Sequence, residues 1–230
     1  MQRNLFAMLL IFMGISMWLI PAQSKTKRHI RKDALLARPV AGMESVNFST
    51  VSALEAALSS AGVPGGITVI TGCKITPEKT IHVSGTTLGA VLRSLVHADP
   101  HYHWSIEDGV VDLLPSQGEP PILSVKIRTF DVKDAANLSD AANVLFGLPE
   151  FREAAARFGL NQGGVQSFLS SGGGKAEAAR GEHHAFQLHL KNTTVLSALN
   201  AIVRANKGGV WIYNERYCNG RGVFNISFSQ

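Results

Sequence analysis

The chain carries one pattern of strand, capped helix and strand twice, and this internal repeat restricts its possible folds more than any other feature. Residues 81–106 align with residues 188–213 without a gap. The identical pairs are His82 with His189, Thr86 with Thr193, Thr87 with Thr194, Leu92 with Leu199, Val96 with Val203, Ala98 with Ala205 and Trp104 with Trp211. A shared helix start, helix face and tryptophan at constant spacing predict that one supersecondary unit is duplicated.

Each copy has the periodicities of a strand followed by an amphipathic helix. Residues 81–84 and 188–190 alternate apolar with polar side chains, which predicts half-buried strands. The Thr-Thr pair that follows supplies a hydroxyl for a helix N-cap. Apolar residues then recur at helical spacing, as Leu88, Val91, Leu92, Leu95 and Val96 in the first copy and as Val195, Ala198, Leu199, Ile202 and Val203 in the second. We expect Asp99-Pro100 and Lys207-Gly208-Gly209 to end the two helices.

A strand that contains the repeated tryptophan follows each helix. In the first copy, Asp108-Gly109 predicts a tight turn into a strand over 110–114. In the second copy, we expect residues 214–221 to form a longer connection into a strand over 223–228. This connection would place Cys218 in a loop.

The flanking segments extend the repeat into two modules. The predicted upstream elements are a strand over 46–48, a helix that ends at 62–64 and a strand over 67–70 in the first half, and a strand over 123–132 with helices over 135–145 and 149–158 in the second. Residues 161–183 are rich in Gly, Ser and Ala, and we expect a flexible insertion there, with a strand over 165–169 inside it. We therefore predict an α+β fold of two tandem βαββαβ modules, residues 45–117 and 118–230, with helices packed on short mixed sheets.

Residues 1–24 have the composition of a signal peptide. Arg3 precedes an apolar run that ends before Pro21, and small residues at Ala22 and Ser24 offer a cleavage site. We expect export to the periplasm or the extracellular space, with Lys25 as the first residue after cleavage. Basic residues just beyond the site resist translocation, so an anchor retained in the inner membrane is the alternative.

The net charge of +5 is concentrated in a basic linker over residues 25–44. Its basic side chains are Lys25, Lys27, Arg28, Arg31, Lys32 and Arg38. The rest of the chain beyond the signal is close to neutral, so we expect no nucleic-acid partner, which would need charge on a folded face. The linker is either a solvated tether or a contact with an anionic membrane surface.

Cys73 and Cys218 are the only cysteines in the sequence. In an oxidising compartment they are candidates for a single disulfide bond. Two buried free thiols are the alternative.

Histidines are the side chains that most suggest a reactive site, but their pattern does not complete one. His97, His101 and His103 could hold Zn²⁺ only with a suitably placed further ligand, and no Glu or Cys has that spacing. We expect His101 and His103 to be solvated. The other candidates are His183 and His184 beside the flexible segment, and His82 and His189 at surface positions of strands.

No catalytic, cofactor-binding or metal-binding residue is predicted. The sequence contains no G-x-S-x-G, no H-E-x-x-H and no phosphate-binding loop. Glu107 and Asp108 form a carboxylate pair, but they occupy a predicted turn. We expect Trp104 and Trp211 to belong to the core rather than to a ligand platform.

Four short segments relate the chain to a known family. They are Val83-Ser84-Gly85-Thr86-Thr87-Leu88, Val91-Leu92, Tyr102-His103-Trp104 and Gly109-Val110-Val111. With the order β-α-β-β-α-β, they resemble the short N-terminal domain of secretins and TonB-dependent receptors, over 45–115 and more weakly over 122–229. The resemblance implies a small α+β module of the export compartment that packs against other proteins. The sequence departs from the family in showing no secretin pore domain, receptor barrel or lipid-attachment cysteine, so roles in pore gating or transmembrane signalling are not carried over.

Two functional hypotheses follow. The first is a non-enzymatic envelope protein whose modules bind other envelope proteins, including secretin or TonB-type systems, through exposed sheet edges. The alternative is an exported enzyme or small-ligand-binding protein that uses residues 161–183 as a lid and nearby histidines for acid–base chemistry. A deep pocket joining that segment to His101 or His103 would favour the alternative.

Overall fold

The computed structural model describes residues 32–43, 45–73, 79–168 and 185–229. The first repeat comprises β1 (Val46–Phe48), α2 (Thr50–Ala61), β2 (Gly65–Thr71), β3 (Ile81–Val83), α3 (Leu88–Ala98), β4 (Tyr102–Glu107) and β5 (Val110–Pro115). The second repeat comprises β6 (Lys126–Ala135), α4 (Leu138–Gly147), α5 (Pro149–Arg157), β7 (Leu160–Phe168), β8 (Phe186–Thr194), α6 (Val195–Ala205), β9 (Val210–Cys218) and β10 (Arg221–Ser229). The predicted α+β class with mixed sheets is confirmed.

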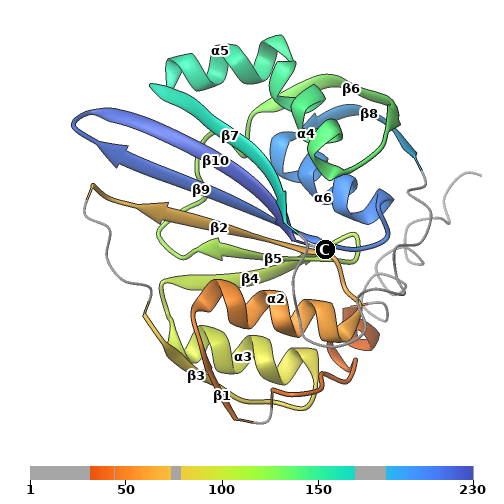
Figure 1. Ribbon diagram of the computed structural model, residues 1–230, viewed down its shortest axis with the longest axis vertical. Helices are drawn as coiled ribbons and strands as arrows, with labels where there is room; N and C mark the ends of the chain where they lie inside the picture. Colours follow the sequence, from red (N-terminus) through yellow and green to blue (C-terminus); the bar gives the residue numbers. More distant parts are fainter. Residues whose placement is uncertain (1–31, 44, 74–78, 169–184, 230) are drawn as a thin grey trace, which may run out of the picture.

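The two repeats share one six-stranded sheet, which the sequence analysis did not predict. The strand order is β4-β5-β2-β9-β10-β7, so the first three strands come from the first repeat and the last three from the second (Figure 1). Parallel pairing of β2 with β9 joins the halves. Each repeat also keeps a separate antiparallel ribbon, β1 with β3 and β6 with β8.

The predicted helix starts are confirmed by their capping hydrogen bonds. The Thr87 hydroxyl accepts from the Ala90 amide at the start of α3, and the Thr194 hydroxyl accepts from the Ser197 amide at the start of α6. These bonds satisfy amides that the helix itself leaves unpaired. The repeat is therefore visible at the level of single hydrogen bonds.

The outer faces of the two ribbons repeat a cross-strand pair. His82 lies opposite Asn47 and His189 lies opposite Asp131. Each histidine Nδ1 contacts the side-chain oxygen of its partner. Both histidines are exposed, as expected for the polar side of a half-buried strand.

Two hydrophobic cores lie on opposite faces of the shared sheet. Alternate residues of β9 show this division, because Val210 and Ile212 pack with α2 and α3, whereas Trp211 and Tyr213 pack with α4 and α6. Side chains of successive strand residues point to opposite faces, so one strand serves both cores. Figure 1 shows α2 and α3 towards the β4 end of the sheet and α4, α5 and α6 towards the β7 end.

The second repeat is inverted relative to the first. In the first repeat β5 and β2 are parallel and β4 is antiparallel to them. In the second, the equivalent strands β10 and β7 are parallel and β9 is antiparallel. Because β2 and β9 are parallel across the junction, equivalent strands of the two repeats run in opposite directions, and their helices cover opposite faces.

The turn after β9 corrects one prediction. Residues 214–221 are not a long connection, because β9 extends to Cys218 and a two-residue turn at Asn219-Gly220 leads into β10. Both turn residues have positive φ, at 51° and 72°. Asn-Gly favours such a turn, and it lets both strands of the hairpin run to nine residues.

The expected flexible insertion and the expected linker are both partly ordered, and β7 contains the strand predicted inside the insertion as far as residue 168. Residues 161–168 belong to β7, while 169–184 lie outside the described residues. Within the expected linker, Val40 and Met43 are buried in the core that contains α2 and α3. The Arg38 guanidinium donates to the carbonyls of Ala61 and Gly62. The linker is therefore not a free tether over its last residues.

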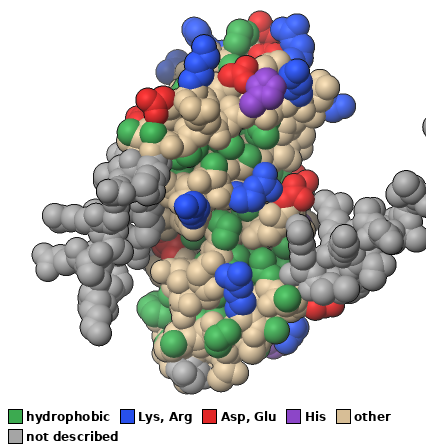
Figure 2. All heavy atoms as spheres, turned by 90° about the vertical axis from the view of Figure 1, so that its right-hand side faces the viewer, with side chains coloured by type: hydrophobic (Ala, Val, Ile, Leu, Met, Phe, Trp, Pro, Cys, Tyr) green, Lys and Arg blue, Asp and Glu red, His purple; other side chains and the backbone are tan. Residues whose placement is uncertain are grey.

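Figure 2 shows charged side chains gathered at the end of the molecule that carries α5, β6 and β8. The exposed residues of β6 include Lys126, Arg128, Asp131, Lys133 and Asp134. Basic and acidic groups are mixed there, which is typical of a solvated face. Among the described residues, no helix is long and apolar enough to cross a membrane.

Candidate functional site

The junction of the two repeats, which we call the seam, is the parallel pairing of Gly65–Thr71 in β2 with β9 residues 210–216. At its start, the Gly65 amide donates to the carbonyl of Gly209. Seven residues of each strand lie in register without a bulge. Parallel strands with a helix layer on each face are typically buried, and the first residues of β2 are buried too.

Two glycines allow the cores to approach the seam from both faces. A Cβ atom at Gly65 would clash with the Leu58 side chain of α2 and with the Val111 carbonyl. A Cβ atom at Gly66 would overlap the indole ring of Trp211. Glycine is therefore required at both positions by close packing, because neither has the positive φ that favours glycine in turns.

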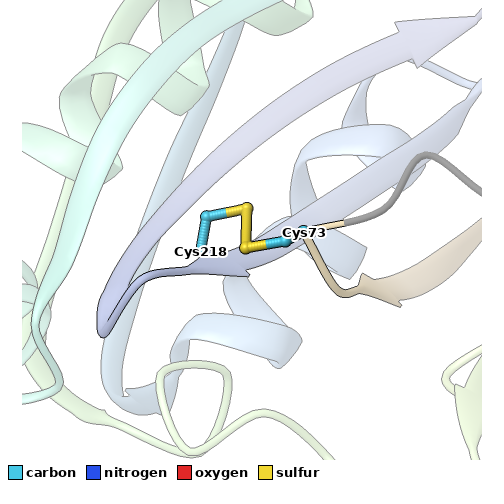
Figure 3. The surroundings of a disulfide bond; sticks show 2 residues. All are labelled: Cys73 and Cys218. Carbon is cyan, nitrogen blue, oxygen red and sulfur yellow. A yellow bond between two sulfur atoms is a disulfide. The ribbon is translucent and has the colours of Figure 1, made fainter.

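A disulfide bond closes the far end of the seam. Cys73 follows β2 and Cys218 ends β9, and the structure joins them with their Cα atoms 4.7 Å apart (Figure 3). The cysteines continue the register that pairs Thr71 with Arg216. The bond thus links the two repeats covalently, and 145 residues separate its ends in the sequence.

A chain of buried hydrogen bonds crosses the seam from the first repeat to the second. The Trp211 indole Nε1 donates to Asn200 Oδ1, and the Asn200 amide donates to Asp112 Oδ2, both at 2.7 Å. Asp112 is on β5 and Asn200 is on α6, so the bond ties a helix of one repeat to a strand of the other. Burial raises the pKa of Asp112 to about 8, although the bond from Asn200 opposes this shift.

Two buried oxygen atoms lack a partner among the described residues, Asp112 Oδ1 and Thr68 Oγ1. A protonated Asp112 carboxyl avoids a buried charge, which explains why the neutral form is favoured. On β9, the Tyr213 hydroxyl donates to Glu215 Oε2. Tyr213 belongs to the core that contains α4 and α6. Burial, followed by this hydrogen bond, raises the pKa of Tyr213.

The predicted histidines form no metal-binding cluster among the described residues. His97, His101 and His103 are exposed, and the His101 ring contacts Asp99 Oδ1 at 3.0 Å. Although burial raises the pKa of Asp99, hydrogen bonds from Thr50 and His101 hold that pKa below its ordinary value. Within the part of the chain that the structure describes, no three His, Cys, Asp or Glu side chains are placed to hold a metal ion.

Most of the lid in the alternative hypothesis, residues 169–183, lies outside the described residues, so that hypothesis stays a prediction. His183 and His184 lie outside the described residues. An open hollow of about 420 Å³ lies elsewhere, between α5 and the start of β6, and its lining includes Lys126, Glu150 and Arg157. Neither His101 nor His103 lines this hollow.

The two repeated tryptophans lie in different cores. Trp211 is fully buried, whereas Trp104 on β4 is half-buried with the Lys32 ammonium 5.5 Å from its ring centroid. They do not form a shared platform. The carboxylates of Glu107 and Asp108 sit at the β4–β5 turn, where Asp108 Oδ2 is 3.5 Å from the Arg204 guanidinium.

The edge strands of the six-stranded sheet are β4 and β7. Their sequences are YHWSIE and LNQGGVQSF, which contain neither Pro, Lys nor Arg and one acid, at the end of β4. Natural edges are usually protected by charge, proline or a covering segment, and among the described residues β7 has a bulge in its pairing with β10 as its one such feature. No strand pairs with the outer side of either edge among the described residues.

Some backbone groups of each edge point outwards. Glu107 and Val110 flank the two-residue turn and pair with each other, so the backbone groups of Trp104 and Ile106 point away from β5. In β7, Val165 and Ser167 are equivalent to β2 residues whose backbone groups bond to β9. The backbone groups of Val165 and Ser167 therefore point away from β10. Within the part of the chain that the structure describes, no strand uses these groups, so an added strand could pair with them.

The comparisons with known proteins give no relative. No family model, no curated protein and no solved structure matches the chain. The resemblance to the secretin and TonB short N-terminal domain stays a prediction from the sequence.

Substitution at Gly66 tests the close packing of the seam. Gly66→Ala is expected to lower the free energy of unfolding by about 1–3 kcal/mol, because its methyl group must displace the Trp211 ring. Gly72→Ala is the matched control, since a Cβ atom there meets nothing within 4 Å. Urea unfolding of both variants measures the difference, and equal stability would show that Trp211 does not need the glycine.

Removal of the disulfide tests its role as a covalent link. Cys73→Ser with Cys218→Ser is expected to lower the unfolding free energy by about 2–4 kcal/mol, since the bond closes a long loop in the unfolded chain. A reducing agent should lower the melting temperature of the native chain to that of the double variant and leave the variant unchanged. An unaltered native melting temperature under reduction would contradict this role.

The buried carboxyl predicts a pH dependence of stability. The pKa of Asp112 is about 8 in the folded chain, and its ordinary value is 3.8. The contribution of the protonated Asp112 carboxyl to folding stability is therefore fully present below pH 3.8 and is lost as the pH rises towards about 8. Asp112→Asn is expected to raise stability at pH 8 by about 2–4 kcal/mol and to change it little at pH 4. Thermal unfolding at both pH values checks this, and a parallel pH profile for both chains would refute it.

Proposed function

We propose that this chain is an exported, non-enzymatic protein that binds other proteins of the cell envelope by adding a strand to its central sheet. The observation that carries the proposal is the open six-stranded sheet with two almost uncharged edge strands. Strand addition uses the backbone for affinity and alternate side chains for specificity. No described strand pairs with the outward backbone groups of Trp104 and Ile106 on β4 or of Val165 and Ser167 on β7.

The pairing of both edge strands within the sheet supports this role. A binding edge is most effective when its strand does not reorganise on binding, because ordering a flexible segment consumes binding free energy. β4 is held by antiparallel pairing with β5. β7 is nine residues long and is held by parallel pairing with β10. The seam then fixes the two halves of the sheet relative to each other through Cys73–Cys218 and the Trp211–Asn200–Asp112 chain.

The class of partner comes from the sequence resemblance. A module similar to the short N-terminal domain of secretins and TonB-dependent receptors favours a component of a secretin or TonB-type system as the bound protein. The signal-like residues 1–24 favour the same compartment, and export is part of the proposal. Residues 25–31, which are basic, precede the part of the chain that the structure describes.

Site-specific photo-crosslinking tests the proposal. A benzoylphenylalanine replaces Ser105 on the β4 edge in the full-length chain, expressed in an envelope-containing host, and mass spectrometry identifies the crosslinked product. We expect a secretin or TonB-system component, together with mature chain that begins at Lys25 by N-terminal sequencing. The same probe at Ser45, which is exposed and lies before β1, is the matched control.

Three results would overturn the proposal. They are equal products from both probe positions, no product from Ser105, or chain that stays in the cytoplasm with its first 24 residues.

A further inference from the structure

We infer that copies of this chain associate head to tail, with β7 of one chain pairing in parallel with β4 of the next. This inference rests on the proposed function, because it uses the same edges, and it names a second copy as one occupant. The chain already contains the contact that serves as its template. Inside each molecule, the equivalent strands β2 and β9 pair in this way at the seam.

The inverted relation of the repeats defines the operation that adds a third unit. Strands β4, β5 and β2 correspond in order to β9, β10 and β7, with directions reversed and helices on the opposite face. A half-turn about an axis that crosses the strands, with a shift along that axis, converts the first repeat into the second. The same operation applied again places a β4 beside β7, parallel to it and in the orientation of the first repeat.

The equivalence of β7 with β2 can be followed residue by residue. Ile67 of β2 pairs with Leu113 of β5, and Ser167 of β7 pairs with Phe228 of β10. Leu113 and Phe228 are themselves equivalent, because each faces the repeated tryptophan of its own hairpin. Ser167 therefore occupies the position of Ile67.

The seam then predicts the register between two chains. Ile67 lies opposite Ile212 in the seam, and the counterpart of Ile212 in the first repeat is Ser105. Ser105 of the second chain is therefore expected to lie opposite Ser167 of the first. Each edge offers outward backbone groups to the other, and neither is used within the described molecule.

The chain-to-chain contact lacks the buried hydrogen bonds and the disulfide that stabilise the seam. Asp112 of the seam corresponds to Ser227, and Asn200 corresponds to Arg93, which is exposed on α3. Gly66, which lies against the Trp211 ring in the seam, corresponds to Gln166 at the chain-to-chain contact. Without the buried carboxyl–amide–indole chain and without a cysteine pair at this contact, we expect association to be reversible and to depend on protein concentration.

This geometry predicts growth beyond a dimer. A contact between two different surfaces of the same molecule leaves one of each surface free after every addition, so it produces chains or closed rings. A contact between identical surfaces would stop at two copies. The size distribution therefore distinguishes the two arrangements.

Engineered cysteines test the register directly. The full-length chain keeps its native cysteines and carries Ser105→Cys together with Ser167→Cys. Adjacent strands place opposed residues within the Cα separation of about 4.4–6.8 Å that a disulfide needs. Mild oxidation is expected to give a ladder of dimers, trimers and larger species on a non-reducing gel, and reduction should collapse it.

Matched variants make the test specific. A mixture of chains with only Ser105→Cys and chains with only Ser167→Cys should stop at a crosslinked dimer that contains one of each. Ser45→Cys with Ser167→Cys is the control, because Ser45 is exposed but away from the sheet edges, and it should show no crosslinked species on the non-reducing gel. An absent ladder, a ladder from the control, or dimers of Ser105→Cys alone would each overturn the inference.

A second pair of variants avoids introduced cysteines. Ser167→Pro removes an amide that points out of the sheet, whereas Ser167→Ala retains it. Sedimentation at increasing concentration should give a monomer for the proline variant and larger species for the native and alanine chains, all three with native circular dichroism. Equal sedimentation of native, alanine and proline chains would contradict pairing at this edge.

These outcomes separate the inference from the proposed function. Monomeric chains that still crosslink a secretin or TonB component from position 105 would overturn self-association and support the binding role. Chains that form the ladder but capture no envelope protein would support self-association and overturn the proposed partner class.

Discussion

Parallel pairing between β2 and β9 is the contact on which the arrangement of the molecule depends. Each repeat alone contributes three sheet strands with helices on one face, which leaves the other face of those strands without a core. The seam solves this for both repeats at once, because each lends its helices to the opposite face of a common sheet. Gly65 and Gly66 permit it, since one admits Leu58 and the other admits Trp211.

The polar groups at the seam limit how the repeats can dock. Hydrophobic packing alone tolerates small slips, whereas Asp112, Asn200 and Trp211 must meet at hydrogen-bonding distance or leave buried polar atoms unsatisfied. Burial of Asp112 opposes stability when the group would be ionised in water. The buried polar groups therefore favour one register of β2 against β9, and burial of Asp112 lowers the folding stability near neutral pH. The disulfide offsets part of this loss of stability.

Local patterns predicted the elements of each repeat, but not the contact between them. The threonine caps, the stripes on α3 and α6 and the Asp108-Gly109 turn all follow from residues close in sequence, and the structure confirms them. The Asn219-Gly220 turn carried an equally clear signal that the expectation of a long loop overlooked. Pairing of β2 with β9 joins strands far apart in the chain, and no periodicity specifies such a partner. Gly65-Gly66 in a strand and Asp112 in an apolar run were hints of close packing and of a buried polar contact.

The long sequence separation across the seam has a consequence for how the chain matures. Synthesis runs from the N-terminus, so β2 is complete long before its partner, which ends at a cysteine 145 residues beyond Cys73. Until β9 arrives, β2 is an unpaired edge, and the equivalent strand of a neighbouring molecule can take the place intended for its own. Such an exchange would produce a domain-swapped pair with native contacts throughout. Oxidation of Cys73 with Cys218 would then make permanent whichever partner β2 had taken, so the timing of disulfide formation decides between a single molecule and an intertwined one.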